Sequence, residues 1–209
     1  MSPRTPSDDP IPSQEHLAGT DPRFAALIAR VGPPALHEPR SSAFEALARS
    51  IVFQQLAGAA ASTIWGRFRA LVPGPLPPEA VLALDEAELR AAGLSGAKAS
   101  AIRDLAVKAM DGTLPLRNLW RLEDDEVIER LVVVRGIGPW TAQMFLMFQL
   151  RRPDVWPLGD LGVRKGYQLT FDLPEMPTPD ELLAHGEQFR PHRSTAAWYF
   201  WRAVDTVTP

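Results

Sequence analysis

Apolar residues recur every three or four positions along most of the chain, which is the period of an amphipathic α-helix. Residues 1–20 come before this pattern and are rich in Pro, Ser and Asp, so we expect them to form a mobile tail. The one β-rich run, L-V-V-V at 131–134, follows a helical run and is better explained as its buried end. The pattern therefore predicts an all-α protein.

Start and stop residues divide the pattern into about ten helices. Asp21 is an N-cap followed by Pro22 at the first helical position, and Ser41 or Ser42 caps the next helix. Asp85 and Glu88 are spaced as a capping box. The expected helices span residues 22–31, 44–56, 59–71, 78–84, 85–92, 96–111, 115–121 and 124–134, with others that begin at Pro139, after Asp160 and after His192.

Composition narrows the class of protein. A chain of 209 residues with 45% hydrophobic and 22% charged residues is typical of a folded protein of one or two domains. It has no cysteine, which excludes disulfides, zinc–thiolate sites and cysteine-ligated iron–sulfur clusters. No apolar run reaches the roughly 18–20 residues of a membrane helix, and the N-terminus lacks the apolar segment of a signal peptide. We expect a cytoplasmic protein, nucleoid-associated if its source is a bacterium.

The net charge of −3 and the isoelectric point near 5.8 argue against a protein that binds nucleic acid through bulk positive charge. A local basic patch is still compatible with these values. Basic residues gather late in the chain, where each is explained either by a phosphate contact or by a solvated helix face: Arg151, Arg152, Arg164, Lys165, Arg190, Arg193 and Arg202.

The segment V-R-G-I-G-P-W-T-A-Q-M-F at 134–145 places two glycines between two predicted helices. Gly136 and Gly138 tolerate positive φ, and Pro139 suits a first helical turn. Phosphate can approach a glycine backbone closely, and the amides that open the second helix point toward it. Thr141 adds a hydroxyl donor. The pattern is that of a helix–hairpin–helix, and an ordinary tight turn is the alternative.

Three stretches together resemble the helix–hairpin–helix DNA glycosylases of the 3-methyladenine DNA glycosylase II type. They are S-I-V-F-Q-Q-L-A-G-A-A-A-S-T-I-W-G-R (50–67), R-G-I-G-P-W-T-A (135–142) with V-W-P-L-G-D-L-G-V-R-K-G (155–166), and F-R-P-H-R-S-T-A-A-W-Y-F-W-R (189–202). The resemblance implies an all-α, two-lobed fold with a DNA-binding cleft between the lobes. We expect one lobe at residues 50–134 and the other at 21–49 together with 135–209.

Asp160 precedes a predicted helix, where an aspartate is most simply an N-cap. The resemblance implies a second role, because an aspartate at this distance after the hairpin is the catalytic carboxylate of these enzymes. An ionised carboxylate stabilises the oxocarbenium-like transition state that forms when an N-glycosidic bond breaks. Alkylated purines already carry positive charge, so one carboxylate suffices for their release.

The resemblance also bears on the step after base release. Relatives that cut the DNA strand carry a lysine that forms a Schiff base two positions after the second hairpin glycine, and this chain has Trp140 there. We therefore expect a monofunctional enzyme. Trp140 matches a tryptophan of the base pocket whose π face holds a cationic base, and a core position is the alternative.

The remaining site residues are also implied by the resemblance. Gln55 and Leu56 match the wedge that fills the space of an extruded base, and a polar helix end is the alternative for Gln55. Phe53 and Met144 are expected to face the pocket. His192 stands where relatives have Trp or Tyr, so it either lines the pocket or caps the last helix. Trp198 and Trp201, at helical spacing, are expected in the core.

Two further contacts are expected, one at a separate helix start and one at the hairpin. Lys98, at the start of a helix, is a candidate for a phosphate contact, with a solvated surface position as its alternative. The backbone carbonyls that hold a monovalent cation in relatives match Val132, Val134 and Ile137. No side-chain metal site is visible, and no other cofactor is expected.

These features predict a monofunctional base-excision glycosylase that flips alkylated bases of the 3-methyladenine type out of double-stranded DNA and leaves an abasic site. We expect it to act as a monomer, with no membrane partner. Two alternatives are a non-catalytic helix–hairpin–helix module that binds DNA structures and a helical protein-interaction domain. The first would not need Asp160, and the second would not bind DNA even at low salt.

Overall fold

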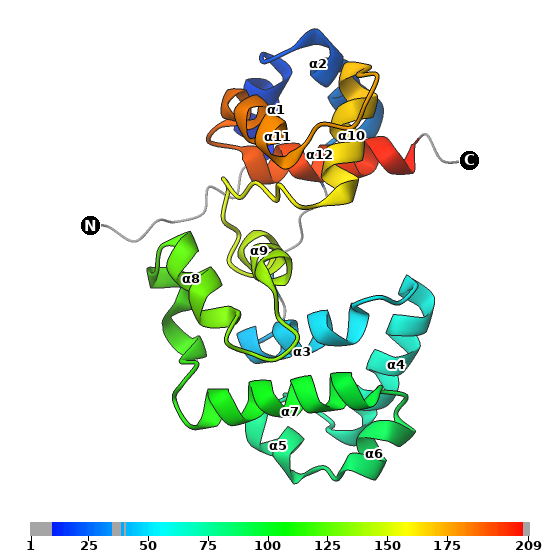
Figure 1. Ribbon diagram of the computed structural model, residues 1–209, viewed down its shortest axis with the longest axis vertical. Helices are drawn as coiled ribbons and strands as arrows, with labels where there is room; N and C mark the ends of the chain where they lie inside the picture. The colour runs from blue at the N-terminus through cyan, green and yellow to red at the C-terminus, as the bar shows by residue number, and fades with distance from the viewer. Residues whose placement is uncertain (1–9, 35–38, 40, 207–209) are drawn as a thin grey trace. The chain divides into compact units, whose positions relative to one another are not determined.

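The computed structural model describes residues 10–34, 39 and 41–206 (Figure 1). The described residues form helices and no strand, which confirms the all-α prediction. The elements are α1 Pro10–Ala18, α2 Pro22–Val31, α3 Ala43–Phe53, α4 Gly58–Leu71, α5 Pro78–Ala83, α6 Glu86–Ala91, α7 Gly96–Met110, the 3-10 helix η1 Leu116–Arg121, α8 Asp124–Leu131, α9 Pro139–Phe148, α10 Leu161–Phe171, α11 Pro179–Gly186, the 3-10 helix η2 Glu187–Phe189 and α12 Arg193–Asp205.

The chain divides into two compact units, and each is described by itself. The terminal unit consists of residues 1–37 and 146–209, and the central unit consists of residues 38–145. In this division residues 41–49 and 135–145 belong to the central unit, whereas the lobes expected from the sequence place them with the other part. Gly136 of the hairpin lies against α7, where a Cβ added to it would be 3.4 Å from the Cβ of Ala101.

The predicted helix caps are confirmed. The Asp21 carboxylate accepts a hydrogen bond from the amide of Arg23 at 2.8 Å, and Ser42, rather than Ser41, caps α3. Asp85 and Glu88 form the reciprocal bonds of a capping box. A further capping box at Thr178, which opens α11, is written in the sequence as T-P-D-E and was not among the expected helix starts.

Three expectations about the helices are wrong. The helix expected at 44–56 ends at Phe53, and Gln54 is its C-cap. Residues 10–18 form a helix instead of a tail, because Leu17 is fully buried and the Gln14 amide donates to the hydroxyl of Tyr199 at 2.8 Å. The rest of that predicted tail, residues 1–9, lies outside the described residues, as residues 207–209 do. In addition, α8 ends at Leu131 and not at 134, and Val133 is 48% exposed beyond it.

The terminal unit is held together by a close contact between α10 and α12, which cross in Figure 1. A Cβ added to Gly166 of α10 would lie 1.9 Å from the carbonyl oxygen of Phe200 in α12, so only glycine fits there. Aromatic rings fill the space around this contact and pack tilted or edge-to-face: Phe24, Trp156, Tyr167, Phe171, Phe189, Tyr199 and Phe200.

The central unit is built around α7, which packs against α3 and α5 (Figure 1). The apolar faces of these helices supply fully or almost fully buried side chains: Leu47, Ile51, Val81, Ile102 and Leu105. The hairpin is attached to the same helix α7. The core of the central unit therefore fixes the backbone of the hairpin.

Candidate active site

Only one of the two hairpin glycines has the positive φ that glycine tolerates. Gly136 has a φ of +79°, whereas Gly138 does not have a positive φ, and a Cβ added to Gly138 would meet no atom within 4 Å. The amide of Ala142 makes the first bond of α9, to the Gly138 carbonyl at 3.1 Å. The amides before it are not part of the helix ladder, so the start of α9 has the geometry of an anion site.

Three hydrogen bonds fasten the hairpin to its surroundings within the central unit. The amide of Arg135 donates to the Asp104 carboxylate at 2.8 Å. The side-chain amide of Gln54 donates to the Gly136 carbonyl at 2.9 Å and to the Thr141 hydroxyl oxygen at 3.3 Å. Thr141 is only 4% exposed, so its hydroxyl faces the protein interior. The expected phosphate contact through this hydroxyl is therefore not supported.

Lys98 has a structural role in place of the expected phosphate contact. Its ammonium group donates to the carbonyl of Val52 at 2.6 Å and to the carbonyl of Gln54 at 2.8 Å. Burial lowers the pKa of Lys98 from its ordinary value. The ammonium group thus satisfies carbonyls at the C-terminus of α3, where the helix leaves such groups without an internal partner.

Gln55 and Leu56, which the resemblance implies as the wedge, lie in the turn after α3, whose Gln54 carbonyl is bonded to Lys98. Gln55 is exposed and has a φ of 56°, in the left-handed region that a non-glycine residue adopts at a cost of about 1 kcal/mol or more. Leu56 is 38% exposed. Phe53 is half-buried, and the guanidinium of Arg49 lies 4.1 Å from its ring centroid. An exposed, strained turn is typical of a functional segment.

Trp140 is not a core residue. It is the second residue of α9 and is 48% exposed, next to the exposed Gly138. Met144, one turn later, is half-buried. The exposure of a large aromatic side chain at this position removes the core explanation and favours a role in binding.

Asp160 belongs to the terminal unit and is both buried and hydrogen-bonded. It is 7% exposed and is the N-cap of α10, where its Oδ1 accepts the amide of Val163 at 2.8 Å. The same oxygen accepts the indole N–H of Trp201 at 2.9 Å. The N-cap explanation is therefore right. The cap orients the carboxylate, so it is compatible with the catalytic role that the resemblance implies.

Trp201 is the site residue that the sequence did not reveal. It is half-buried instead of a full core residue, and it lies 41 positions after Asp160. No local pattern could have connected the two residues. Only the packing of α10 against α12 brings the indole to the carboxylate.

His192 stands directly before α12, and its side chain makes no cap bond, so the capping alternative is wrong. Its ring meets the ring of His16 edge-to-face at 5.3 Å. Burial lowers the pKa of His192, and the neighbouring His16 acts in the same direction. His192 is half-buried and packs within the terminal unit.

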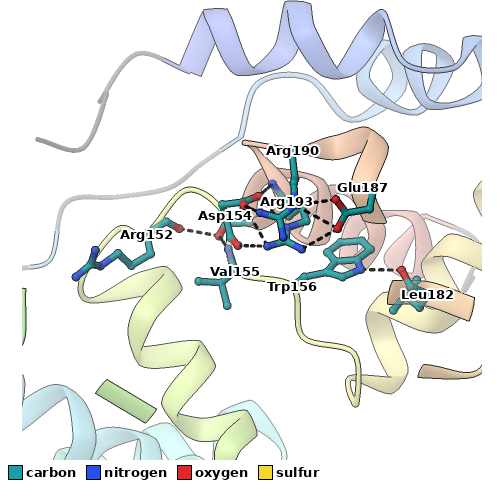
Figure 2. Close-up of polar contacts among 9 residues, drawn as sticks. Arg152, Asp154, Val155, Trp156, Leu182, Glu187, Arg190 and Arg193 are labelled. Carbon is teal, nitrogen blue, oxygen red and sulfur yellow. Dashed lines mark hydrogen bonds and ion pairs between the residues drawn. The ribbon is translucent and has the colours of Figure 1, made fainter. Parts of the chain in front are cut away.

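The segment that leads to Asp160 is anchored by a cluster of ion pairs (Figure 2). Arg193, which is 9% exposed, contacts the Asp154 carboxylate at 2.8 and 3.0 Å, and Arg190 reaches the same carboxylate at 2.7 Å. Arg190 also pairs with Glu187 at 3.0 Å. These two arginines of the predicted basic patch thus form ion pairs with acidic side chains and hold the segment.

Buried bonds continue this anchor toward Asp160. The Ser194 hydroxyl donates to the Arg152 carbonyl at 2.6 Å and accepts the Val155 amide at 2.9 Å (Figure 2). The indole of Trp156 donates to the Leu182 carbonyl at 2.8 Å. The backbone of residues 152–156, which leads to Asp160, is therefore held by contacts with α11 and α12.

Comparison with known proteins gives the family. Residues 48–191 match the family model described as HhH-GPD superfamily base excision DNA repair protein. The chain belongs to this superfamily. The matched residues include the turn with Gln55 and Leu56, the hairpin and Asp160, so all three expected parts of the site fall inside the match.

Individual relatives of the HhH-GPD chain agree with this result. DNA-3-methyladenine glycosylase 1 of Schizosaccharomyces pombe is 37% identical over 192 residues, which are 90% of this chain and 84% of the relative. The structure of the 3-methyladenine DNA glycosylase of that organism in complex with abasic DNA matches with a TM-score of 0.83 and 35% identity, over 91% of this chain and 95% of that one. The DNA-3-methyladenine glycosidase of Bacillus halodurans matches with a TM-score of 0.83 and 35% identity, over 97% and 92%.

Among residues 10–34, 39 and 41–206, no group of three or more His, Asp or Glu side chains could hold a metal ion. Within the same ranges, no helix is long and apolar enough to cross a membrane.

Proposed function

We propose that this protein is a monofunctional DNA glycosylase that removes alkylated bases of the 3-methyladenine type from double-stranded DNA and leaves an abasic site. The observation that carries the proposal is Asp160, a buried carboxylate that is oriented by two hydrogen-bond donors. The relatives that are 35–37% identical support the substrate class. A monomer is the proposed working form.

In the proposed mechanism, the damaged base leaves the duplex before its bond to the sugar breaks. Bond cleavage leaves positive charge on the deoxyribose, and the Asp160 carboxylate stabilises this charge most strongly where water is excluded. The same carboxylate orients the water that attacks the sugar. A methylated purine departs readily because its own positive charge is neutralised as it leaves.

Trp140 supports both the choice of base and the absence of strand cleavage. An indole has no nucleophilic amine, so it cannot form the Schiff base that precedes cleavage of the strand. Its exposed π face can instead attract a cationic base, with a free energy on the order of 0.5–2 kcal/mol. Phe53, Met144 and His192 are proposed to line the base pocket.

The hairpin is proposed to hold the DNA backbone through Gly138 and the amides that open α9. Gln55 and Leu56 are proposed as the wedge. The cation expected in this family would be held by the carbonyls of Val132, Val134 and Ile137. The Val134 carbonyl accepts the Ile137 amide at 3.0 Å, and a carbonyl oxygen has a second lone pair for a cation.

The decisive experiment measures the bases released from alkylated DNA by the wild type and by Asp160→Asn. Asparagine keeps the oxygen that caps α10 and removes the negative charge. We expect the variant to lose excision by about 10²–10³-fold or more and to keep its affinity for abasic DNA. A variant that excises at the wild-type rate would remove Asp160 from the mechanism.

The monofunctional character has a separate test. With wild-type protein, borohydride should trap no covalent complex with DNA, and strands should break only after heat or alkali. Trapping by purified protein would contradict this part of the proposal. The two non-catalytic alternatives predict no base release at all, and the protein-interaction domain further predicts no DNA binding at low salt.

A further inference from the structure

The indole of Trp201 is held in one orientation by contacts on two sides. Its ring stacks on Phe148, with centroids 5.9 Å apart and an interplanar angle of 28°. On another side it passes Gly162, where an added Cβ would lie 2.7 Å from Cδ1 of the indole and 3.1 Å from Oδ1 of Asp160. Gly162 thus leaves the space in which the indole approaches the carboxylate.

The hydrogen bonds to Asp160 come from two different helices. The Val163 amide belongs to α10, which Asp160 itself caps, whereas the indole N–H belongs to α12. The Val163 amide restrains Oδ1 from the side of α10 and the indole N–H restrains it from the side of α12. Together the two donors narrow the range of orientations that the carboxylate can adopt.

We propose that Trp201 is a positioning residue for catalysis: its N–H orients the Asp160 carboxylate toward the sugar of the flipped nucleotide. This inference rests on the proposed function of Asp160. Stabilisation of a transition state by a charged group depends on its being held in place before the reaction, because reorientation during the reaction would cost free energy. A hydrogen bond to a charged acceptor is stronger than one between neutral groups, so its loss should be measurable as a slower reaction.

The test distinguishes the contribution of the indole N–H from the contribution of the shape of the ring. Replacement of Trp201 by benzothienylalanine keeps the bicyclic ring and puts sulfur in place of the N–H, whereas Trp201→Phe removes both. Single-turnover excision from alkylated DNA should slow by about tenfold or more with either replacement. Affinity for abasic DNA and the unfolding temperature of the benzothienylalanine protein should stay at wild-type values.

Trp198→Phe is the matched control. Trp198 lies in the same helix, is half-buried, and packs against Tyr199 and Arg202. We expect it to excise at the wild-type rate. Gly162→Ala approaches the same contact from α10, since the added methyl group displaces the indole, and it should slow excision as the replacement of Trp201 does.

The Asp160→Asn background shows whether Trp201 acts through the carboxylate. There Trp201→Phe should cause little further loss, because the two effects are not additive when one residue acts through the other. Wild-type excision by the benzothienylalanine protein, or equal losses with Trp198→Phe, would overturn the inference. Absence of excision by the wild type would instead refute the proposed function.

Discussion

The side-chain amide nitrogen of Gln54 lies 2.9 Å from the carbonyl oxygen of Gly136, although the two residues are 82 positions apart. The bond joins the turn after α3 to the hairpin before α9. Because Lys98 holds the carbonyl of Gln54 at the same time, this turn is fixed through both its backbone and its side chain. The parts proposed to contact the DNA backbone and to fill the vacated base stack are thus connected within the central unit.

The first prediction concerns Gln54. Gln54→Ala should lower the free energy of unfolding by about 0.5–1.5 kcal/mol, because it leaves the Gly136 carbonyl without this donor. It should also weaken binding of abasic DNA. Gln55→Ala is the control, since that side chain is exposed, and its change in stability should stay within about 0.5 kcal/mol. Urea unfolding and a DNA titration measure both quantities, and equal stability losses would contradict the role of Gln54.

The two hairpin glycines should respond differently to alanine. Gly136→Ala should destabilise the protein by about 1–2 kcal/mol, because alanine is strained at a φ of +79°. Gly138→Ala should leave stability within about 0.5 kcal/mol, since nothing lies within 4 Å of the added Cβ. If a phosphate approaches Gly138, the same methyl group should weaken DNA binding by about tenfold. Unchanged affinity would remove Gly138 from the backbone contact.

Lys98 should behave as a structural lysine. Lys98→Met removes two hydrogen bonds to carbonyls and should lower the free energy of unfolding by about 1.5–3 kcal/mol. DNA affinity measured over a range of salt concentrations should keep the slope of the wild type. A lysine that contacts phosphate would instead reduce the slope by about one on substitution. A reduced slope without a loss of stability would restore the phosphate contact expected from the sequence.

Asp104 predicts how acid affects the hairpin. Although burial acts to raise its pKa, the hydrogen bonds from Lys108 and from the Arg135 amide lower the pKa of Asp104 below 3.8. A lowered pKa in the folded state means that the stabilisation is fully present above the unfolded value and is lost as pH falls through the folded value. Asp104→Asn should therefore be less stable than the wild type at pH 7, and the difference should shrink below about pH 4. Urea unfolding over this pH range measures the difference, and a constant difference would refute the assignment.

Local signals explain why most helices could be predicted from the sequence. Asp21, Ser42 and Asp85 act on amides two or three positions away, so the chain carries both partners of each bond in one short segment. Helix α1 escaped prediction because its stability comes from burial of Leu17 and a bond to Tyr199, which lies 185 positions after Gln14.

The candidate site shows the same division between local and distant signals. Gly136, Trp140 and Asp160 could be named as candidates because they stand in short stretches that resemble a family. The partners of Lys98 and Asp160 could not, because Val52 and Trp201 lie 46 and 41 positions away and are brought close only by packing. A sequence does not distinguish a lysine whose ammonium group donates to backbone carbonyls from one that binds a phosphate.

Helix α12 touches the Asp154–Asp160 segment at both of its ends. Arg193, at the start of the helix, forms an ion pair with Asp154, and Trp201, about two turns later, donates a hydrogen bond to Asp160. One helix therefore holds the two ends of this segment at a fixed separation, while the Val163 amide of α10 supplies the other bond to the carboxylate. A substitution that shifts Arg193 relative to Trp201 within α12 should thus disturb Asp160 even though it touches neither the carboxylate nor its donors.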